Sequence, residues 1–131
     1  MIINPLIMLV DDNRMDLFIS EKTIKYAGIA ERFVICRNGT EAFHYLHNNL
    51  HNVELLPDVI FLDLNMPGMN GMEFMKQYEL LPETVTNRIK VVILSSSEDD
   101  KDKEAIINNK HITNYILKPL SEENLTILKA S

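Results

Sequence analysis

Four short apolar runs in this sequence of 131 residues end at or just before side chains that can do chemistry. These side chains are the carboxylates of Asp11, Asp12 and Asp63, the hydroxyl of Ser95 and the ammonium of Lys118. Three carboxylates brought together repel one another and favour a divalent cation, and oxygen ligands with room for water suit Mg2+. A carboxylate can also attack phosphorus and form an aspartyl phosphate. Mg2+ and Lys118 would then neutralise charge, and Ser95 could donate a hydrogen bond to a phosphoryl oxygen.

Each of these residues taken alone has an ordinary structural role. An acidic pair such as Asp11-Asp12 more often caps a helix or lies in a solvated loop. A lysine such as Lys118 more often lies on the surface. The chemical interpretation therefore depends on the elements that would have to bring the residues together.

Short apolar runs alternate with amphipathic stretches along the whole chain. The apolar runs predict strands at Leu6–Val10, Glu31–Cys36, Asp58–Leu62, Lys90–Leu94 and Thr113–Leu117. Helices are predicted from Asp12 or Asn13 to Gly28, from Thr40 to about Asn48, over Met72–Leu81, within Asp100–Asn109, and as a short last helix over Glu122–Lys129.

Strands that alternate with helices predict βαβ units and an α/β fold with a parallel sheet. The uniformly apolar runs Val59–Leu62 and Val91–Leu94 are typical of strands covered by helices on both faces. We therefore predict a doubly wound, five-stranded parallel sheet with the strand order 2-1-3-4-5. Ligands bind such sheets at the carboxyl edge, where this order reverses between the first and third strands, so all the reactive residues should meet there.

Composition limits the class of protein. The length fits one domain over residues 1–131, and 46% hydrophobic and 24% charged residues are ordinary for a globular chain. The formal net charge is −6 and no basic stripe is present, so direct nucleic-acid binding is not expected. No signal peptide is evident and no apolar run approaches the ~18 residues of a membrane span, so no membrane insertion is expected. The single cysteine, Cys36, excludes an internal disulfide and fits a reducing cytoplasm.

The segment Pro57–Gly71 closely resembles the phosphoacceptor segment of response regulator receiver domains, which belong to bacterial two-component systems. Asp11-Asp12, Asn38–Ala42 and Tyr115–Pro119 resemble the other landmarks of this family. Together these segments cover nearly the whole chain. The resemblance implies the flavodoxin-like fold of the CheY-like proteins, which has the strand order already predicted.

The resemblance also implies roles for the acidic residues. Asp63 would be the phosphorylated aspartate. Asp12 would bind Mg2+ directly and Asp11 through water. Asn65, two residues after Asp63, would give its backbone carbonyl to the metal.

Further roles follow for the residues after the fourth and fifth strands. Lys118 would contact the phosphoryl group and precede a cis peptide bond to Pro119. Ser95 and Tyr115 would be the hydroxyl and the aromatic residue of the switch, with the hydroxyl moving toward the phosphoryl group while the ring turns inward. Ser97 stands at a position that tunes the lifetime of the phosphoryl group. Two further departures from the family pattern are Lys110-His111 before the fifth strand and a short last helix.

The partners implied are a sensor histidine kinase or a histidine phosphotransfer protein as donor, and a downstream protein as target. The chain would be a switch or a phosphorelay intermediate, and its only chemistry would be its own phosphorylation and dephosphorylation.

Three other functions fit parts of the same pattern. A small Mg2+-dependent phosphohydrolase would use the same aspartyl phosphate, but such enzymes usually carry a second Asp where this chain has Asn65. A flavodoxin-like cofactor carrier would need a phosphate-binding loop after the first strand. Asp11-Asp12 lie in that loop and would repel a phosphate. A zinc site on one helix face is a further possibility, although a solvated face is the better interpretation of His44, His47 and His51.

Overall fold

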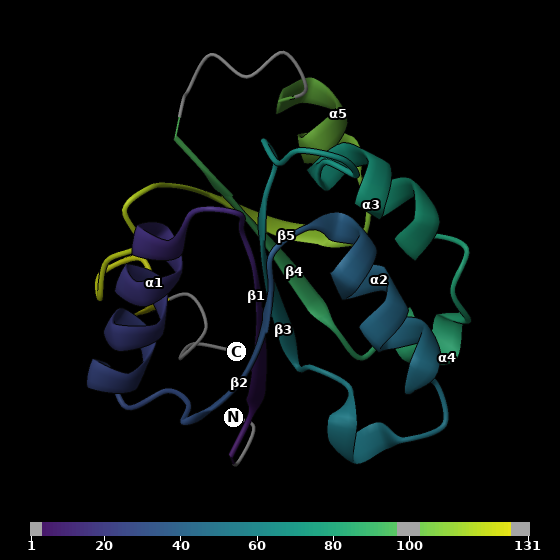
Figure 1. Ribbon diagram of the computed structural model, residues 1–131, viewed down its shortest axis with the longest axis horizontal. Coiled ribbons are helices and arrows are strands. Elements are labelled where there is room, and N and C mark those ends of the chain that lie inside the picture. The colour runs from purple at the N-terminus through teal and green to yellow at the C-terminus, as the bar shows by residue number, and fades with distance from the viewer. Residues whose placement is uncertain (1–3, 97–102, 127–131) are drawn as a thin grey trace.

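The computed structural model of the chain describes residues 4–96 and 103–126, and within them five parallel strands form one sheet (Figure 1). The strand order is β2-β1-β3-β4-β5, as predicted. The strands are β1 (Leu6–Val10), β2 (Arg32–Cys36), β3 (Val59–Asp63), β4 (Lys90–Ser95) and β5 (Ile112–Leu117). The helices are α1 (Arg14–Tyr26), α2 (Gly39–Asn48), α3 (Gly71–Tyr78), α4 (Glu83–Thr86) and α5 (Lys103–Asn108), with a 3-10 turn, η1 (Val53–Leu55).

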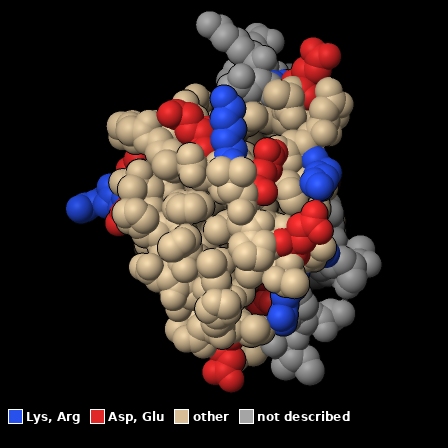
Figure 2. Space-filling view, turned by 90° about the vertical axis from the view of Figure 1, so that its right-hand side faces the viewer, with Lys and Arg blue, Asp and Glu red and all other residues tan. Residues whose placement is uncertain are grey.

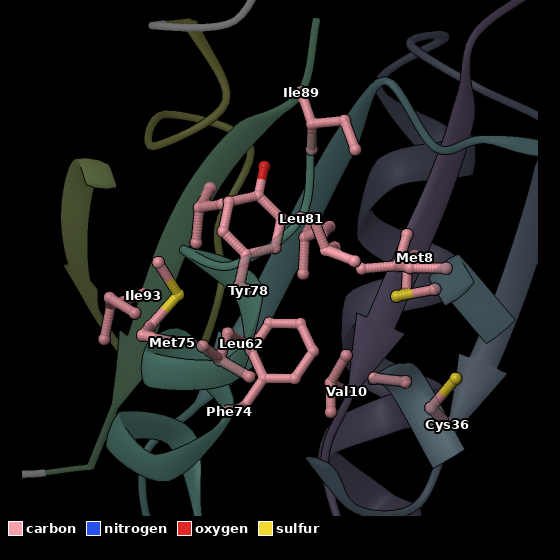
Figure 3. Close-up of a cluster of buried hydrophobic side chains, with 14 of the residues drawn as sticks. Met8, Val10, Cys36, Leu62, Phe74, Met75, Tyr78, Leu81, Ile89 and Ile93 are labelled. Atoms are coloured by element: carbon pink, nitrogen blue, oxygen red, sulfur yellow. The ribbon is translucent and has the colours of Figure 1, made fainter. Parts of the chain in front are cut away.

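The sheet separates two hydrophobic clusters. Helix α1 covers one face, and α2, α3 and α5 cover the other (Figure 1). On the α1 side, Leu17 and Ile24 pack against Ile7 and Phe61 of the strands. On the other side, Phe74, Met75 and Tyr78 of α3 pack against strand residues that include Met8, Val10, Leu62 and Ile93 (Figure 3). All residues of β1 and β3 are buried, which explains why these strands are apolar up to Asp63, the last residue of β3.

Several boundaries differ from the predictions. Strand β3 includes Asp63 and β4 includes Ser95, so these residues end their strands instead of following them. The predicted helix Met72–Leu81 is wrong at its end, because α3 stops at Tyr78 and a separate short helix, α4, follows Pro82. The turn η1 was not predicted. Residues 100–102 of the fourth predicted helix lie outside the described residues, as does 127–129 of the last one, where residues 122–125 form turns.

Asp58 joins three strands at the edge of the sheet opposite their carboxyl ends. Its backbone N–H donates to the Leu6 carbonyl at 2.8 Å, and its side-chain Oδ2 accepts from the Leu6 N–H at 2.8 Å. Its own carbonyl accepts from the Lys90 N–H at 3.0 Å. These bonds fix where β1, β3 and β4 begin relative to one another.

Two surface properties bear on the predicted partners. The face formed by α2, α3 and α4 shows acidic and basic side chains scattered among uncharged ones, with no basic stripe among its described residues (Figure 2). Among the residues that the structure describes, no helix combines the length and apolar character that crossing a membrane requires.

Candidate phosphoacceptor and metal site

The register of the sheet brings the predicted residues to one edge. Val10 pairs with Leu62, so Asp11 and Asp63 follow neighbouring positions in β1 and β3. Asp63 in turn pairs with Leu94, which places Ser95 one step further along β4. Ser95 pairs with Leu117, and the backbone N–H of Lys118 donates to the Ser95 carbonyl at 2.7 Å. Four strands thus deliver their terminal residues to the predicted place.

The three acidic residues lie within ligand distance of a common cation. One oxygen from each of Asp11, Asp12 and Asp63 can be chosen so that all three lie within 4.8 Å of one another. Asp11 and Asp63 are each only 5% exposed. The backbone also holds Asp11 in place, because its N–H donates to the Cys36 carbonyl at 3.0 Å and its Oδ1 accepts from the Asn13 N–H at 2.9 Å. A group of hard carboxylate oxygens such as this one fits Mg2+.

Burial raises the pKa of Asp63 to about 6, and the negative charge of Asp11 acts in the same direction. The Lys118 ammonium and the Asn65 N–H, which donates to Asp63 Oδ1 at 3.4 Å, act in the opposite direction. Asp63 is therefore a carboxylate that is costly to ionise in this environment. A bound cation would favour its ionised, nucleophilic form.

The Lys118 ammonium lies among carboxylates. Its Nζ donates to Asp11 Oδ2 and to Asp16 Oδ2, each at 2.8 Å, and lies 3.7 Å from Asp63 Oδ1. Burial alone would lower the pKa of Lys118, but the hydrogen bonds to Asp11 and Asp16 and the charge of Asp63 raise it above its ordinary value. Lys118 is therefore positively charged at neutral pH. The Lys118–Pro119 peptide bond is cis, as predicted.

Asp16 is the one residue of this constellation that the sequence did not indicate. It lies in the first turn of α1, where an acidic residue is common because it stabilises the helix dipole. Because this role is so common, the sequence gives no indication that Asp16 also contacts Lys118.

The two predicted switch residues lie in adjacent strands. Ser95 is fully buried at the end of β4. Tyr115 lies in β5 beside Ile93 of β4, packs against the cluster on the α3 side, and has the Lys103 Nζ 5.7 Å from its ring centroid. Of the two, Ser95 has a backbone contact with the site residue Lys118, and the switching role of both residues stays a prediction. Ser97 lies outside the described residues.

Other candidate groups behave as structural residues. Burial raises the pKa of Cys36 to about 12, so this thiol is packed and unreactive. His111 makes an edge-to-face contact with the Tyr78 ring at 5.5 Å between centroids. Within residues 4–96 and 103–126, only the group Asp11, Asp12 and Asp63 has the spacing of a metal site, so the three histidines His44, His47 and His51 do not form one.

Comparisons with known proteins agree with this geometry. Residues 7–128 match the sequence model of the response regulator receiver domain. The probable methanogenesis regulatory protein FilR2 of Methanothrix harundinacea is 31% identical over 92% of this chain and 76% of its own length. A two-component response regulator from Cytophaga hutchinsonii has a crystal structure that superposes with a TM-score of 0.88, with 26% identity and coverage of 98% of this chain and 96% of that one. The phosphorylated cyanobacterial phytochrome response regulator RcpA superposes with a TM-score of 0.77, with 30% identity and coverage of 98% and 91%.

Proposed function

Because the chain belongs to the response regulator receiver domain family, we propose that it accepts a phosphoryl group on Asp63 and thereby switches its binding to a protein target. The observation that carries this proposal is the convergence of three carboxylates and the Lys118 ammonium at the carboxyl edge of the sheet. The similarity to RcpA, whose structure is that of a phosphorylated regulator, supports the same conclusion.

The metal in this proposal is Mg2+, held by the side chains of Asp11, Asp12 and Asp63 and the backbone carbonyl of Asn65. The donor set fits such an ion because it consists of hard oxygens and carries an excess of negative charge. When bound, the ion supplies positive charge that neutralises the transferring phosphoryl group.

The chemistry of the chain is a single displacement at phosphorus. An Asp63 oxygen forms a bond to the phosphorus of a phosphohistidine, the P–N bond breaks, and the departing imidazole takes a proton from water. The donor is a sensor histidine kinase or a histidine phosphotransfer protein. Lys118 and the Ser95 hydroxyl then donate hydrogen bonds to phosphoryl oxygens. The reaction takes place in the cytoplasm, where a free thiol such as Cys36 persists.

The proposed switch uses the contact between β4 and β5. The Ser95 carbonyl accepts the Lys118 N–H, so a shift of one strand end is transmitted to the other. Movement of Ser95 toward the phosphoryl group would make room for the Tyr115 ring to turn inward. The surface formed by α5, β5 and the following segment would then change its affinity for a target protein, either a switch partner or the next phosphotransfer protein in a relay.

Turnover of an external phosphoester is not part of this function. A phosphohydrolase of the aspartyl-phosphate type uses a carboxylic acid two residues after its nucleophile to protonate the leaving group. That position is occupied by Asn65, whose amide cannot supply the proton. We therefore expect phosphorylation of the chain itself and no sustained release of product.

Intact mass measured after incubation with acetyl phosphate and Mg2+ tests the proposal. The wild type should gain the mass of one phosphoryl group, and Asp63→Asn should gain none. EDTA should abolish the adduct on the wild type, and Asp12→Asn should slow its formation strongly because a metal ligand is lost. Glu83→Gln, which removes an exposed carboxylate far from the site, is the matched control and should behave as wild type. Absence of an adduct on folded wild type under all these conditions would contradict the proposal.

A further inference from the structure

Asp16 contributes a fourth carboxylate to the site, and it does so from a helix, whereas the other three come from the ends of strands. Its backbone N–H donates to the Asn13 side chain at 3.0 Å, which fixes the start of α1. Its side chain is 31% exposed and contacts the Lys118 Nζ at 2.8 Å. This distance equals that between Lys118 and the deeply buried Asp11. Among the described residues, Asp16 is not part of the group with metal-ligand spacing, so Lys118 and not a metal is the partner that the structure gives it.

The three carboxylates near Lys118 differ in how closely they contact its ammonium. An ammonium has three N–H donors, and Asp11 and Asp16 accept from two of them. Asp63 Oδ1 lies 3.7 Å from the nitrogen, which is too long for a hydrogen bond. Asp63 thus forms an ion pair with Lys118 but is the one carboxylate of these three that does not accept a hydrogen bond from it, and the two hydrogen-bonded carboxylates leave the third N–H to a further acceptor.

A phosphoryl group on Asp63 would be that acceptor. It would project beyond the carboxylate and add three strongly accepting oxygens. We propose that Asp16 is a positioning residue that, together with Asp11, holds Lys118 set back from Asp63, so that the remaining N–H meets a phosphoryl oxygen instead of the free carboxylate.

This inference rests on the proposed function, and it makes a definite statement about the loss of Asp16. With only Asp11 to hold it, the ammonium would move toward the buried negative charge of Asp63 and form a hydrogen bond with it. This bond would occupy a lone pair of the nucleophile and part of the space that the phosphoryl group needs. Asp16→Asn should therefore slow phosphorylation by acetyl phosphate about tenfold and weaken binding of the phosphoryl mimic beryllofluoride about tenfold. Affinity for Mg2+ should change less than about fivefold, because Asp16 lies outside the metal group.

The experiment compares five forms of the full chain: the wild type, Asp16→Asn, Glu21→Gln, Lys118→Met, and Asp16→Asn combined with Lys118→Met. Glu21→Gln is the matched control, because it removes a carboxylate from the same helix, where the partner is Lys25 at 3.8 Å. Phosphorylation rates come from intact mass at saturating Mg2+. Beryllofluoride affinity comes from fluorine NMR, and Mg2+ affinity from titration followed by proton–nitrogen NMR.

The proposal expects Asp16→Asn to lose about tenfold in both rate and beryllofluoride affinity, with Glu21→Gln within about twofold of wild type. In the Lys118→Met background, Asp16→Asn should change neither quantity by more than about twofold, because a residue that acts through Lys118 has no effect once Lys118 is gone. Should Asp16→Asn fail to fold, Asp16→Ser removes the same carboxylate and carries the same expectations.

Three results would overturn the proposal: wild-type behaviour of Asp16→Asn, an equal loss in the Lys118→Met background, or a loss that higher Mg2+ restores. Failure of the wild type to accept a phosphoryl group is a different outcome, which contradicts the proposed function itself. A phosphorylated wild type beside an unaffected Asp16→Asn would contradict the role of Asp16 alone.

Discussion

At the scale of single residues, Asp63 has two conflicting requirements. The nucleophile role proposed for it requires an ionised carboxylate, yet burial and the neighbouring Asp11 favour its protonated form and raise its pKa to about 6. Lys118 compensates only in part, since its ammonium is bonded to Asp11 and Asp16. The site therefore holds a destabilising charge at neutral pH, and a bound divalent cation would relieve it. This conflict has measurable effects on stability and on metal binding.

Asp63→Asn should be more stable than the wild type at about pH 7.5 without Mg2+, by about 1–3 kcal/mol. The pKa of Asp63 is about 6 in the folded chain and near the ordinary 3.8 in the unfolded chain. Between these values the unfolded state releases a proton that the folded state keeps. The contribution of wild-type Asp63 to stability is therefore fully present below about pH 4 and is lost as pH rises through about 6.

Urea unfolding at several pH values measures this difference. The advantage of Asp63→Asn should shrink as pH falls below about 6 and vanish near pH 4. Glu21→Gln, in which the lost carboxylate is partly exposed on α1, is the control and should show no such trend. If Asp63→Asn is no more stable than the wild type at neutral pH, the buried Asp63 carboxylate does not destabilise the folded chain and this prediction is wrong.

Affinity for Mg2+ should depend on pH over the same range. The cation needs an ionised Asp63, so protons compete with it below about pH 6. Titration with Mg2+ should give a dissociation constant that rises about tenfold for each pH unit below the pKa of Asp63. A constant that does not change between about pH 5 and pH 7 would show that Asp63 is not a ligand.

Residue types and strand ends were sufficient to predict that Asp11, Asp12, Asp63 and Lys118 lie close together, because strand ends are visible in the sequence as the points where apolar runs stop. Their chemical roles stay predictions. Asp16 was not predictable in this way. Its position depends on how α1 is rotated against the sheet, which is set by the packing of Leu17 and Ile24 and not by any local pattern. The roles expected of Asn65, Ser95 and Tyr115 stay predictions.

At the scale of elements, the loop between β3 and α3 determines how closely the start of α3 packs against Asp63 and Leu64. Gly71 begins α3, and its N–H donates to the Leu64 carbonyl at 3.0 Å. A Cβ on Gly71 would lie 2.7 Å from the Asp63 carbonyl oxygen and 2.8 Å from the Leu64 Cα. Asn70 and Glu73 close the start of the same helix with reciprocal side-chain bonds to each other's backbone N–H. The helix thus begins directly against the end of β3, which carries Asp63.

Gly71→Ala should destabilise the chain by about 2 kcal/mol, because the backbone atoms that the new methyl group meets cannot easily give way. It should also weaken Mg2+ binding, since the displaced atoms belong to Asp63 and its neighbour. Gly68→Ala is the matched control: its φ is +76° but a Cβ there meets nothing within 4 Å, so only a backbone cost of about 1 kcal/mol is expected. Thermal unfolding and Mg2+ titration of both variants test this, and an equal effect of the two would refute it.

The error in the third predicted helix has a physical cause. Leu81 is buried, as helical periodicity requires, but a turn and not a helix brings it into the core, through a bond from its N–H to the Tyr78 carbonyl. The spacing of apolar residues cannot distinguish a helix that continues to Leu81 from a turn that places Leu81 in the core. Helix α4, with four residues, is too short to show a period at all. The five strands were predicted to within about one residue at their ends, because short, uniformly apolar runs are typical of strands that helices cover on both faces.

At the scale of the whole molecule, the site lies where the two hydrophobic clusters end. Each face of the sheet has its own cluster, and the carboxyl edge between them is where the polar residues gather. A ligand at this edge contacts β1 and β3 at once, and Lys118 extends the contact to β5. Binding there should stabilise the whole fold and not one element, because these strands unfold together.

Mg2+ should therefore raise the melting temperature of the wild type in proportion to the logarithm of its concentration above the dissociation constant. The gain should approach about 2.7 kcal/mol at one hundred times that constant. Asp12→Asn, which removes a ligand, should lose most of this gain while remaining folded. Differential scanning calorimetry with and without Mg2+ measures it, and an equal gain in Asp12→Asn would show that the ion acts elsewhere.

Asp58 has a consequence for the accuracy with which the site is assembled. Adjacent parallel strands could slide by one residue and still bury apolar side chains, because β1 and residues Val59–Leu62 of β3 are all apolar. Such a slip would move Asp11 by about 3.3 Å relative to Asp63 and separate the two ligands. The bonds between Asp58 and Leu6 are lost in any shifted register, although they lie at the far end of both strands. By fixing the register at the start of β1, Asp58 also determines that Asp11, at the other end of the strand, lies beside Asp63.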